Sequence, residues 1–451
     1  MKIQKQVPLT EGPILKSLTG LAVPIMISSF LGTLYNITDM AWIGLLGSKA
    51  VAAVGVGGMY VWLSQGLASL ARMGGQVHVA QCLGRGDKEQ AHRYAKTAVQ
   101  LSILLGLAFA AVSLLFTDPL VGFFKLEGVK TILDAKIYMR ITCGLILFSF
   151  LNLTLTGLYT AQGDSKTPFV ANFIGLLINL LLDPLLILGV GPFPRIEVAG
   201  AAVATVSAQL VVMLVMMVRV FRSKKGENVL KGIRLFEPFS KEELGNICKI
   251  GGPTAIQGMV YCMISMVLTR MVAAFGAEAI ATQRVGGQIE SVSWNTADGF
   301  AAALNAFVGQ NYGAKKMDRV QKGYRISFWT VAIWGALIML AFIIFPGPIA
   351  GVFFHEEKAM EIAIRYLIII GFSEAFMCVE LMTIGALSGL GKTKLCSVIS
   401  ITATSMRIPL AMVLSRTSLG LDGIWWALTL TSVAKGIIFY LTFRYQMREK
   451  C

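Results

Sequence analysis

Apolar stretches of about twenty residues recur from one end of the chain to the other. Examples are 14–42, 97–116, 325–345, 395–415 and 424–443. As a helix, each stretch can cross a hydrocarbon core about 30 Å thick. Of the 451 residues, 55% are hydrophobic and only 14% are charged, more apolar surface than a soluble protein could bury. The sequence therefore predicts an all-α membrane protein with twelve transmembrane helices.

The net charge of +15 raises the question of a nucleic-acid partner. Lysine and arginine also gather in the cytoplasmic loops of membrane proteins. With the N-terminus inside and twelve spans, 26 of the 40 basic residues fall in cytoplasmic segments and 6 in external loops. This asymmetry favours a multi-pass protein of the plasma or inner membrane, with both termini cytoplasmic and no nucleic-acid partner. We also expect a monomer surrounded by membrane lipids.

The seven cysteines do not form a redox or metal-binding motif. No CxxC pair occurs, and most cysteines lie in or beside apolar stretches, as packing residues do. We therefore expect no disulfide, no metal site and no cofactor. The chain also lacks HExxH and GxSxG, which argues against a membrane-embedded enzyme.

The second half of the chain repeats the first at a nearly constant offset. One register pairs Pro24 with Pro253, Gly47 with Gly276, Ala50 with Ala279, Gly57-Gly58 with Gly286-Gly287, Gln81 with Gln310 and Gly84 with Gly313. A register shorter by a single position pairs Gly157, Gly163 and Lys166 with Gly385, Gly391 and Lys394. Duplicated halves are common in transporters. Six spans in each half give both halves the same orientation, which predicts two six-helix lobes related by a pseudo-two-fold axis along the membrane normal.

The repeat also sets the expected domain boundaries. An N-terminal lobe, 1–221, is joined to a C-terminal lobe, 249–451, by a basic cytoplasmic linker, 222–248. Within the linker, residues 229–239 alternate between apolar and charged side chains. The linker therefore either lies on the cytoplasmic surface or forms a solvated loop.

Two carboxylates, Asp39 and Asp183, interrupt apolar stretches of the first half. An ionisable side chain at membrane depth is costly and usually functional. At 1.5 Å per residue, Asp39 lies about 36 Å into the first span and Asp183 about 22 Å into the fifth, with Asn179 one turn before it. We expect the two acids to meet in one lobe. The alternatives are an exposed acid at a span end for Asp39, and a helix cap or an ion pair with Arg72 for Asp183.

Several short segments occur in a fixed order on this twelve-span frame. They are Pro24, Tyr35–Asp39, Ile43-Gly44, Gly157–Pro168, Asn179–Pro184 (NLLLDP), Gly200–Thr205 (GAAVAT) and Val308–Ala314. With these segments the chain resembles the multidrug and toxic compound extrusion (MATE) transporters over nearly its whole length. The resemblance implies a secondary antiporter that exports cationic or amphipathic compounds in exchange for Na⁺ or H⁺.

Within that family the chain looks closest to the DinF-like branch, which carries its membrane acids in the N-terminal lobe. Leu268 occupies the repeat position of Asp39, so the second half has no acid there. The NorM-like branch also places key carboxylates in the second lobe. Glu290, Glu374 and Glu380 therefore remain alternative acids of the C-terminal lobe, with Glu380 at the repeat position of Asn152.

The coupling site can be assigned to Na⁺ or to a proton. Na⁺ needs several oxygen ligands, and we expect them from Asp183, Asn179, the Thr205 hydroxyl and the Ala201 carbonyl, with Asp39 nearby. The resemblance implies the same set. A proton would need only a carboxyl made basic by burial or by a second acid. Tyr35, one turn before Asp39, either donates a hydrogen bond to it or anchors the helix at the interface.

The expected substrate cavity combines residues that face the central cleft of the MATE fold. They are Met26, Tyr35, Met59, Asn152, Met259 and Met263. Methionine adapts to many ligands, although for any single methionine core packing is the more common role. We expect Arg270, Arg284 and Arg407 to anchor span ends or to pair with acids. The competing hypothesis is a flippase for lipid-linked oligosaccharides or other lipids from the same superfamily.

Overall fold

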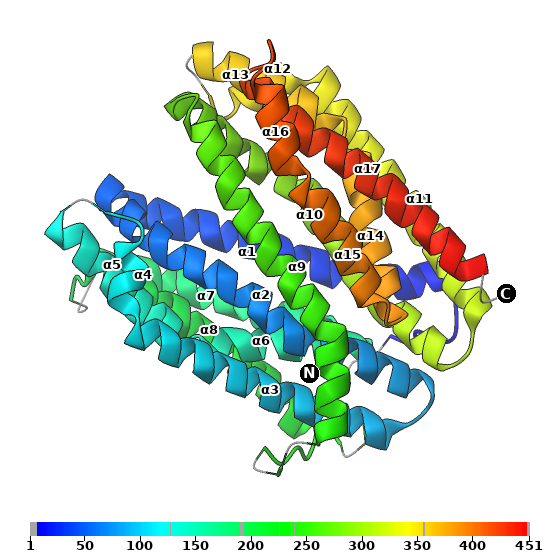
Figure 1. Cartoon of the computed structure of the whole chain (residues 1–451). Helices are drawn as coiled ribbons and strands as arrows, with labels where there is room; N and C mark the ends of the chain where they lie inside the picture. The colour runs from blue at the N-terminus through cyan, green and yellow to red at the C-terminus, as the bar shows by residue number, and fades with distance from the viewer. Residues whose placement is uncertain are drawn as a thin grey trace. The chain divides into compact units, whose positions relative to one another are not determined.

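The protein is helical throughout the part that the structure, a computed structural model, describes (Figure 1). The described residues are 7–126, 128–189, 194–224, 226–235, 237–238, 240–354 and 357–448. The helices of the first half are α1 (Ile14–Gly44), α2 (Ser48–Gly84), α3 (Lys88–Leu115), α4 (Thr117–Gly122), α5 (Val129–Gly144), α6 (Leu147–Ala161), α7 (Lys166–Ile187) and α8 (Glu197–Arg222). Those of the second half are α9 (Lys241–Ala273), α10 (Ala277–Gly313), α11 (Met317–Ile344), α12 (Pro346–Gly351), α13 (Glu357–Gly371), α14 (Glu374–Gly389), α15 (Thr393–Ser405), α16 (Arg407–Ser415) and α17 (Leu421–Arg448).

By length and composition, most of the long helices are suited to span a membrane. Within the described chain, nine helical segments are long and apolar enough to cross a bilayer. The pairs α5–α6 and α13–α14, bent by 43° and 50°, bring the number to 11. The remaining long helix, α10, has 37 residues but also carries Glu278, Arg284 and Glu290. Its place in the repeat is that of α2, so the helices agree with twelve spans.

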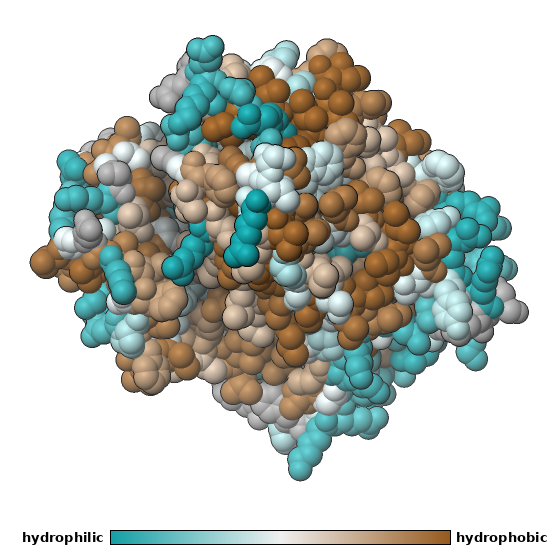
Figure 2. Space-filling model, turned by 45° about the horizontal axis from the view of Figure 1, so that its top comes forward, coloured by the Kyte–Doolittle hydropathy of each residue, from teal (hydrophilic) through white to brown (hydrophobic). Residues whose placement is uncertain are grey.

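The surface of the helices is suited to lipid rather than to water. Large apolar side chains of α11 are exposed at intervals of three or four residues, which places them on one helix face. They are Trp329, Ile333, Leu337, Leu340 and Ile344. Small and polar residues such as Gly323, Ser327 and Gly335 face inward on the same helix. Hydrophobic side chains likewise cover much of the face seen in Figure 2.

The duplication is visible in the helices themselves. The helices α2 and α10 both have 37 residues, and α3 and α11 both have 28. Gly47 and Gly276, which are equivalent in the repeat, precede α2 and α10 with φ angles of 104° and 113°. Only glycine adopts such angles without strain, so both halves use the same turn at the same place.

The chain divides into two compact units. One contains Ile27–Ala255, and the other contains Pro8–Met26 and the residues from Ile256 onward. This division differs from boundaries at 221 and 249, because α1 and α9 each contribute their first part to one unit and the rest to the other. We refer to the units as the N-terminal and C-terminal lobes.

The described part of the segment between α8 and α9 packs on the N-terminal lobe instead of forming a solvated loop. Val229 and Leu230 are 9% and 4% exposed and belong to the core of that lobe. The Val229 amide donates to Gln162 Oε1, at 3.0 Å. Gln100 of α3 donates to the carbonyls of Leu235 and Glu237, at 2.9 and 2.7 Å. The linker is thus docked through both apolar burial and hydrogen bonds.

Candidate functional site

Three helices of the N-terminal lobe bring the predicted coupling residues together. Asp39 comes from α1, Asn179 and Asp183 from α7, and Thr205 from α8. Asp39 is 7% exposed, and both Asn179 and Asp183 are fully buried. Asn179 and Asp183 lie one turn apart on α7, and the Asn179 amide donates to Asp183 Oδ1 at 3.1 Å. The burial of Asp39 contradicts the alternative of an exposed acid at a span end.

The site contains several buried oxygen atoms that have no hydrogen-bond partner in the part of the chain that the structure describes. They are Tyr35 Oη, Asp39 Oδ1, Asn179 Oδ1, Asp183 Oδ2 and Thr205 Oγ1. A buried polar atom without a partner is costly, so native structures usually satisfy it with water, an ion or a proton. Ala201, also on the predicted ligand list, is buried one turn before Thr205 on α8. The oxygen set therefore fits a hard cation or a shared proton.

The ionisable side chains at the centre of the site are two carboxylates, Asp39 and Asp183, and no basic residue of the described chain offsets them. Asp39 and Asp183 are close enough to interact electrostatically. No ion pair with either acid occurs among the described residues, and Arg72 does not reach Asp183. Arg72 packs instead beside Gly157, with its Nε buried and unpaired. The alternative of an Asp183–Arg72 ion pair is therefore wrong.

Two tyrosines border the acids. Tyr35 interacts electrostatically with Asp39 and with Thr205, but its hydroxyl makes no hydrogen bond to Asp39. Of the two roles expected for Tyr35, the hydrogen bond to Asp39 is thus not formed. Tyr138 of α5, which the sequence analysis missed, is 5% exposed and interacts with Asp39 and Asp183. The sequence did contain a signal for Tyr138, because Tyr366 occupies the equivalent position in the internal repeat.

The residues predicted to line a substrate cavity lie in different surroundings. Asn152 of α6 is tied to α8, because its Nδ2 donates to the Gln209 carbonyl at 2.8 Å. Met26 packs against Gly299. Met59 and Met259 are partly buried, whereas Met263 is 62% exposed. Their role in substrate binding stays a prediction.

The three alternative acids of the C-terminal lobe have different partners. The Tyr366 hydroxyl donates to Glu290. Glu374 is fully buried, and both of its carboxylate oxygens lack a hydrogen-bond partner within the described chain. Glu380 forms an ion pair of 2.8 Å with Lys435 of α17. Lys435 was also missed, although a lone lysine within the apolar stretch 424–443 is itself a signal.

Comparison with known proteins links both lobes to one family. The MatE family model matches residues 24–185 and 253–413, together more than half of the chain. The probable multidrug resistance protein NorM of Thermotoga maritima is 28% identical over 456 residues, covering 98% of this chain and 95% of that protein. The FAD transporter of Shewanella oneidensis is 25% identical over 439 residues, covering 96% of this chain and 94% of that protein.

The fold has a close counterpart among solved structures. This solved structure is described as the outward-facing conformation of a multidrug resistance MATE family transporter of the MOP superfamily. It matches with a TM-score of 0.91 at 23% identity and covers 100% of this chain and 99% of its own. The predicted all-helical MATE architecture is therefore confirmed.

Proposed function

Because the chain belongs to the MatE family of membrane transporters, we propose that it is a secondary antiporter that exports amphipathic, mainly cationic compounds in exchange for Na⁺ or H⁺. The single observation that carries this proposal is the N-terminal site, where two buried acids meet three further unpaired oxygens. The expected setting is the plasma or inner membrane, with both termini cytoplasmic and the protein monomeric. Relatives named for multidrug resistance support the export of varied compounds.

The chemistry of coupling follows from shared negative charge. One carboxylate cannot fully neutralise a cationic substrate and a coupling ion at the same time. If either cation weakens the binding of the other, the linkage is reciprocal, and an inward ion gradient can drive the substrate outward. The unpaired oxygens of Asp39, Asp183, Asn179 and Thr205 are suited to take up Na⁺, and the two acids alone are sufficient for a proton.

The first experiment is dye transport in proteoliposomes under an imposed Na⁺ gradient or, separately, an imposed pH gradient. We expect one of the two gradients to drive ethidium movement. Asp39→Asn and Asp183→Asn should each lower the driven rate at least tenfold, because an amide keeps the volume but cannot hold the charge. The matched control is Asp318→Asn, the same change at an exposed position in the first turn of α11.

Two outcomes would contradict this assignment. Near-normal transport by both variants would move the coupling site to the C-terminal lobe, where Glu290, Glu374 and Glu380 are the acids to test. Transport of a lipid-linked sugar without any ion gradient would favour the flippase hypothesis. That hypothesis receives no support from the relatives reported above, whose names refer to multidrug resistance and FAD transport.

A further inference from the structure

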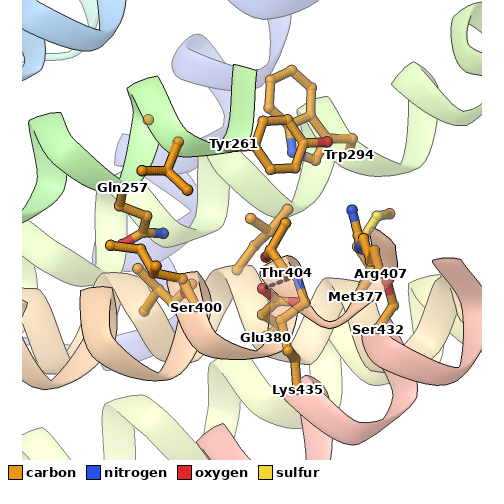
Figure 3. Close-up of a pocket in the computed structure, with 15 residues that line it drawn as sticks. Gln257, Tyr261, Trp294, Met377, Glu380, Ser400, Thr404, Arg407, Ser432 and Lys435 are labelled. Carbon is orange, nitrogen blue, oxygen red and sulfur yellow. Dashed lines mark hydrogen bonds and ion pairs between the residues drawn. The ribbon is translucent and has the colours of Figure 1, made fainter. Parts of the chain in front are cut away.

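A cavity of about 250 Å³ lies within the C-terminal lobe, and its lining shares no residue with the site of the N-terminal lobe. Helices α9, α10 and α14–α17 contribute this lining. Tyr261 and Trp294 lie on one side, and Glu380 and Lys435 lie on the other (Figure 3). The volume is below that of pockets that enclose a whole drug-sized molecule. The cavity therefore suits the polar head of a ligand together with part of a ring.

The charges of the cavity do not cancel. Lys435 pairs with Glu380, and both side chains are almost completely buried. Arg407, 7% exposed, donates instead to the hydroxyls of Thr431 and Ser432, at 3.0 and 2.8 Å. Within the described residues, no carboxylate lies within ion-pair distance of Arg407. The lining of the cavity thus holds two cations, Lys435 and Arg407, but one carboxylate, Glu380, which is paired with Lys435.

The surroundings of Arg407 increase this imbalance. Arg407 and Lys435 are close enough to repel each other. Glu290 interacts with Arg407 at longer range, but the Tyr366 hydroxyl is bonded to that acid. A buried guanidinium without a direct counter-charge is unfavourable unless another anion completes its environment. The Ser400 hydroxyl, which also lines the cavity, is buried without a partner among the described residues.

The internal repeat shows that the charges at equivalent positions differ between the two lobes. In the register that pairs Gly157 with Gly385, Asn179 corresponds to Arg407 and Asp183 corresponds to Ala411. The amide that bonds to a carboxylate in the N-terminal lobe is thus replaced by a guanidinium, and the carboxylate by a methyl group. The C-terminal lobe thus gains a positive charge at the position of Asn179 and has no charge at the position of Asp183.

We propose that this cavity binds the anionic group of an amphipathic ligand, namely a carboxylate, sulfonate or phosphate. The Arg407 guanidinium offers planar N–H donors that match such a group, and Ser400 offers a further hydroxyl. Trp294 and Tyr261, 49% and 45% exposed, provide aromatic faces for the attached ring. This site goes beyond the proposed export of cations, because it adds organic anions and zwitterions to the compounds that the protein binds.

The binding test compares two fluorescent probes that differ only in charge. The full-length protein is placed in nanodiscs of phosphatidylcholine and titrated with dansylglycine, a carboxylate, or with dansylglycinamide, its neutral amide. We expect tighter binding of the carboxylate. Arg407→Gln should weaken carboxylate binding at least tenfold, about 1.4 kcal/mol, and change amide binding less than twofold. Arg416→Gln, the same change at the exposed end of α16, is the matched control.

A second variant keeps the proposal falsifiable if Arg407→Gln does not fold. Glu380→Gln removes the counter-charge of Lys435, so it should strengthen binding of the carboxylate and leave the amide unchanged. Equal affinity of the wild type for both probes would overturn the proposal. So would weaker carboxylate binding in Glu380→Gln, or an equal loss for both probes in a folded Arg407→Gln protein.

Two further experiments identify the source of the anion and test this binding site independently of the proposed ion coupling. In nanodiscs containing phosphatidylglycerol, competition with dansylglycine would assign the site to a lipid headgroup, and its absence to a soluble amphiphile. Either result supports an anion site. The double variant Asp39→Asn, Asp183→Asn should still bind dansylglycine although it loses ion-driven transport. Failure of the proposed antiport therefore leaves this test intact.

Discussion

Gly57 and Gly286 occupy the same position in the two lobes, where each makes room for a tyrosine ring. A Cβ atom on Gly57 would lie 2.5 Å from Tyr138 Cδ1, and one on Gly286 would come closer still to the ring of Tyr366. Both tyrosines lie beside buried acids: Tyr138 near Asp39, and Tyr366 bonded to Glu290. The repeat has thus kept the glycine–tyrosine contact while the acids around it changed.

The adjacent glycines provide a sharp test of this contact. Gly57→Ala and Gly286→Ala should each destabilise the protein by about 1–3 kcal/mol, because the new methyl group overlaps a ring in a packed interior. Gly58→Ala and Gly287→Ala meet open space and should leave stability unchanged or slightly raised. Unfolding in detergent, followed by tryptophan fluorescence, measures the difference. Equal effects of all four substitutions would show that the tyrosine contact is not what selects glycine.

At the scale of elements, one predicted span differs between the lobes. The apolar stretch 395–415 forms two helices, α15 and α16, which meet at Met406. Pro409 has no N–H to donate to the carbonyl of Ser405, which accounts for the break. Pro184 sits in the last turn of α7, where it leaves that helix continuous. The break places Arg407 at the start of α16, beside the cavity of the C-terminal lobe.

The docked linker is a second element that can be tested alone. Gln100→Ala removes two hydrogen bonds to the linker carbonyls and should loosen residues 229–235 and 237–238 without unfolding the spans. We expect trypsin to cut after Lys231 and Arg234 several-fold faster in this variant. Gln288→Ala, the same change at an exposed position of α10, is the control. Unchanged cleavage in Gln100→Ala would mean that the buried Val229 and Leu230 alone hold the linker.

At the scale of the whole molecule, the sequence was sufficient to predict the helical fold and to predict that Asp39 and Asp183 meet in one lobe. Span length, the internal repeat and a carboxylate in an apolar stretch are local or periodic signals. The cavity of the C-terminal lobe was not predictable in this way. Arg407 was expected to anchor a span end or to pair with an acid, yet it bonds to the hydroxyls of Thr431 and Ser432. Its partners depend on how α16 packs against α17, which hydropathy does not encode.

The orientation in the membrane can be tested across a single span. The distribution of basic residues predicts that Lys392 lies on the cytoplasmic side and Arg416, beyond α15 and α16, on the external side. In a background without Cys248 and Cys451, Arg416→Cys should react in intact cells with a maleimide that cannot cross the membrane. Lys392→Cys should react only after the cells are permeabilised. The remaining native cysteines are buried and provide low background. The opposite pattern would invert the topology, and it would then place Asp39 and Asp183 nearer the cytoplasm than the exterior.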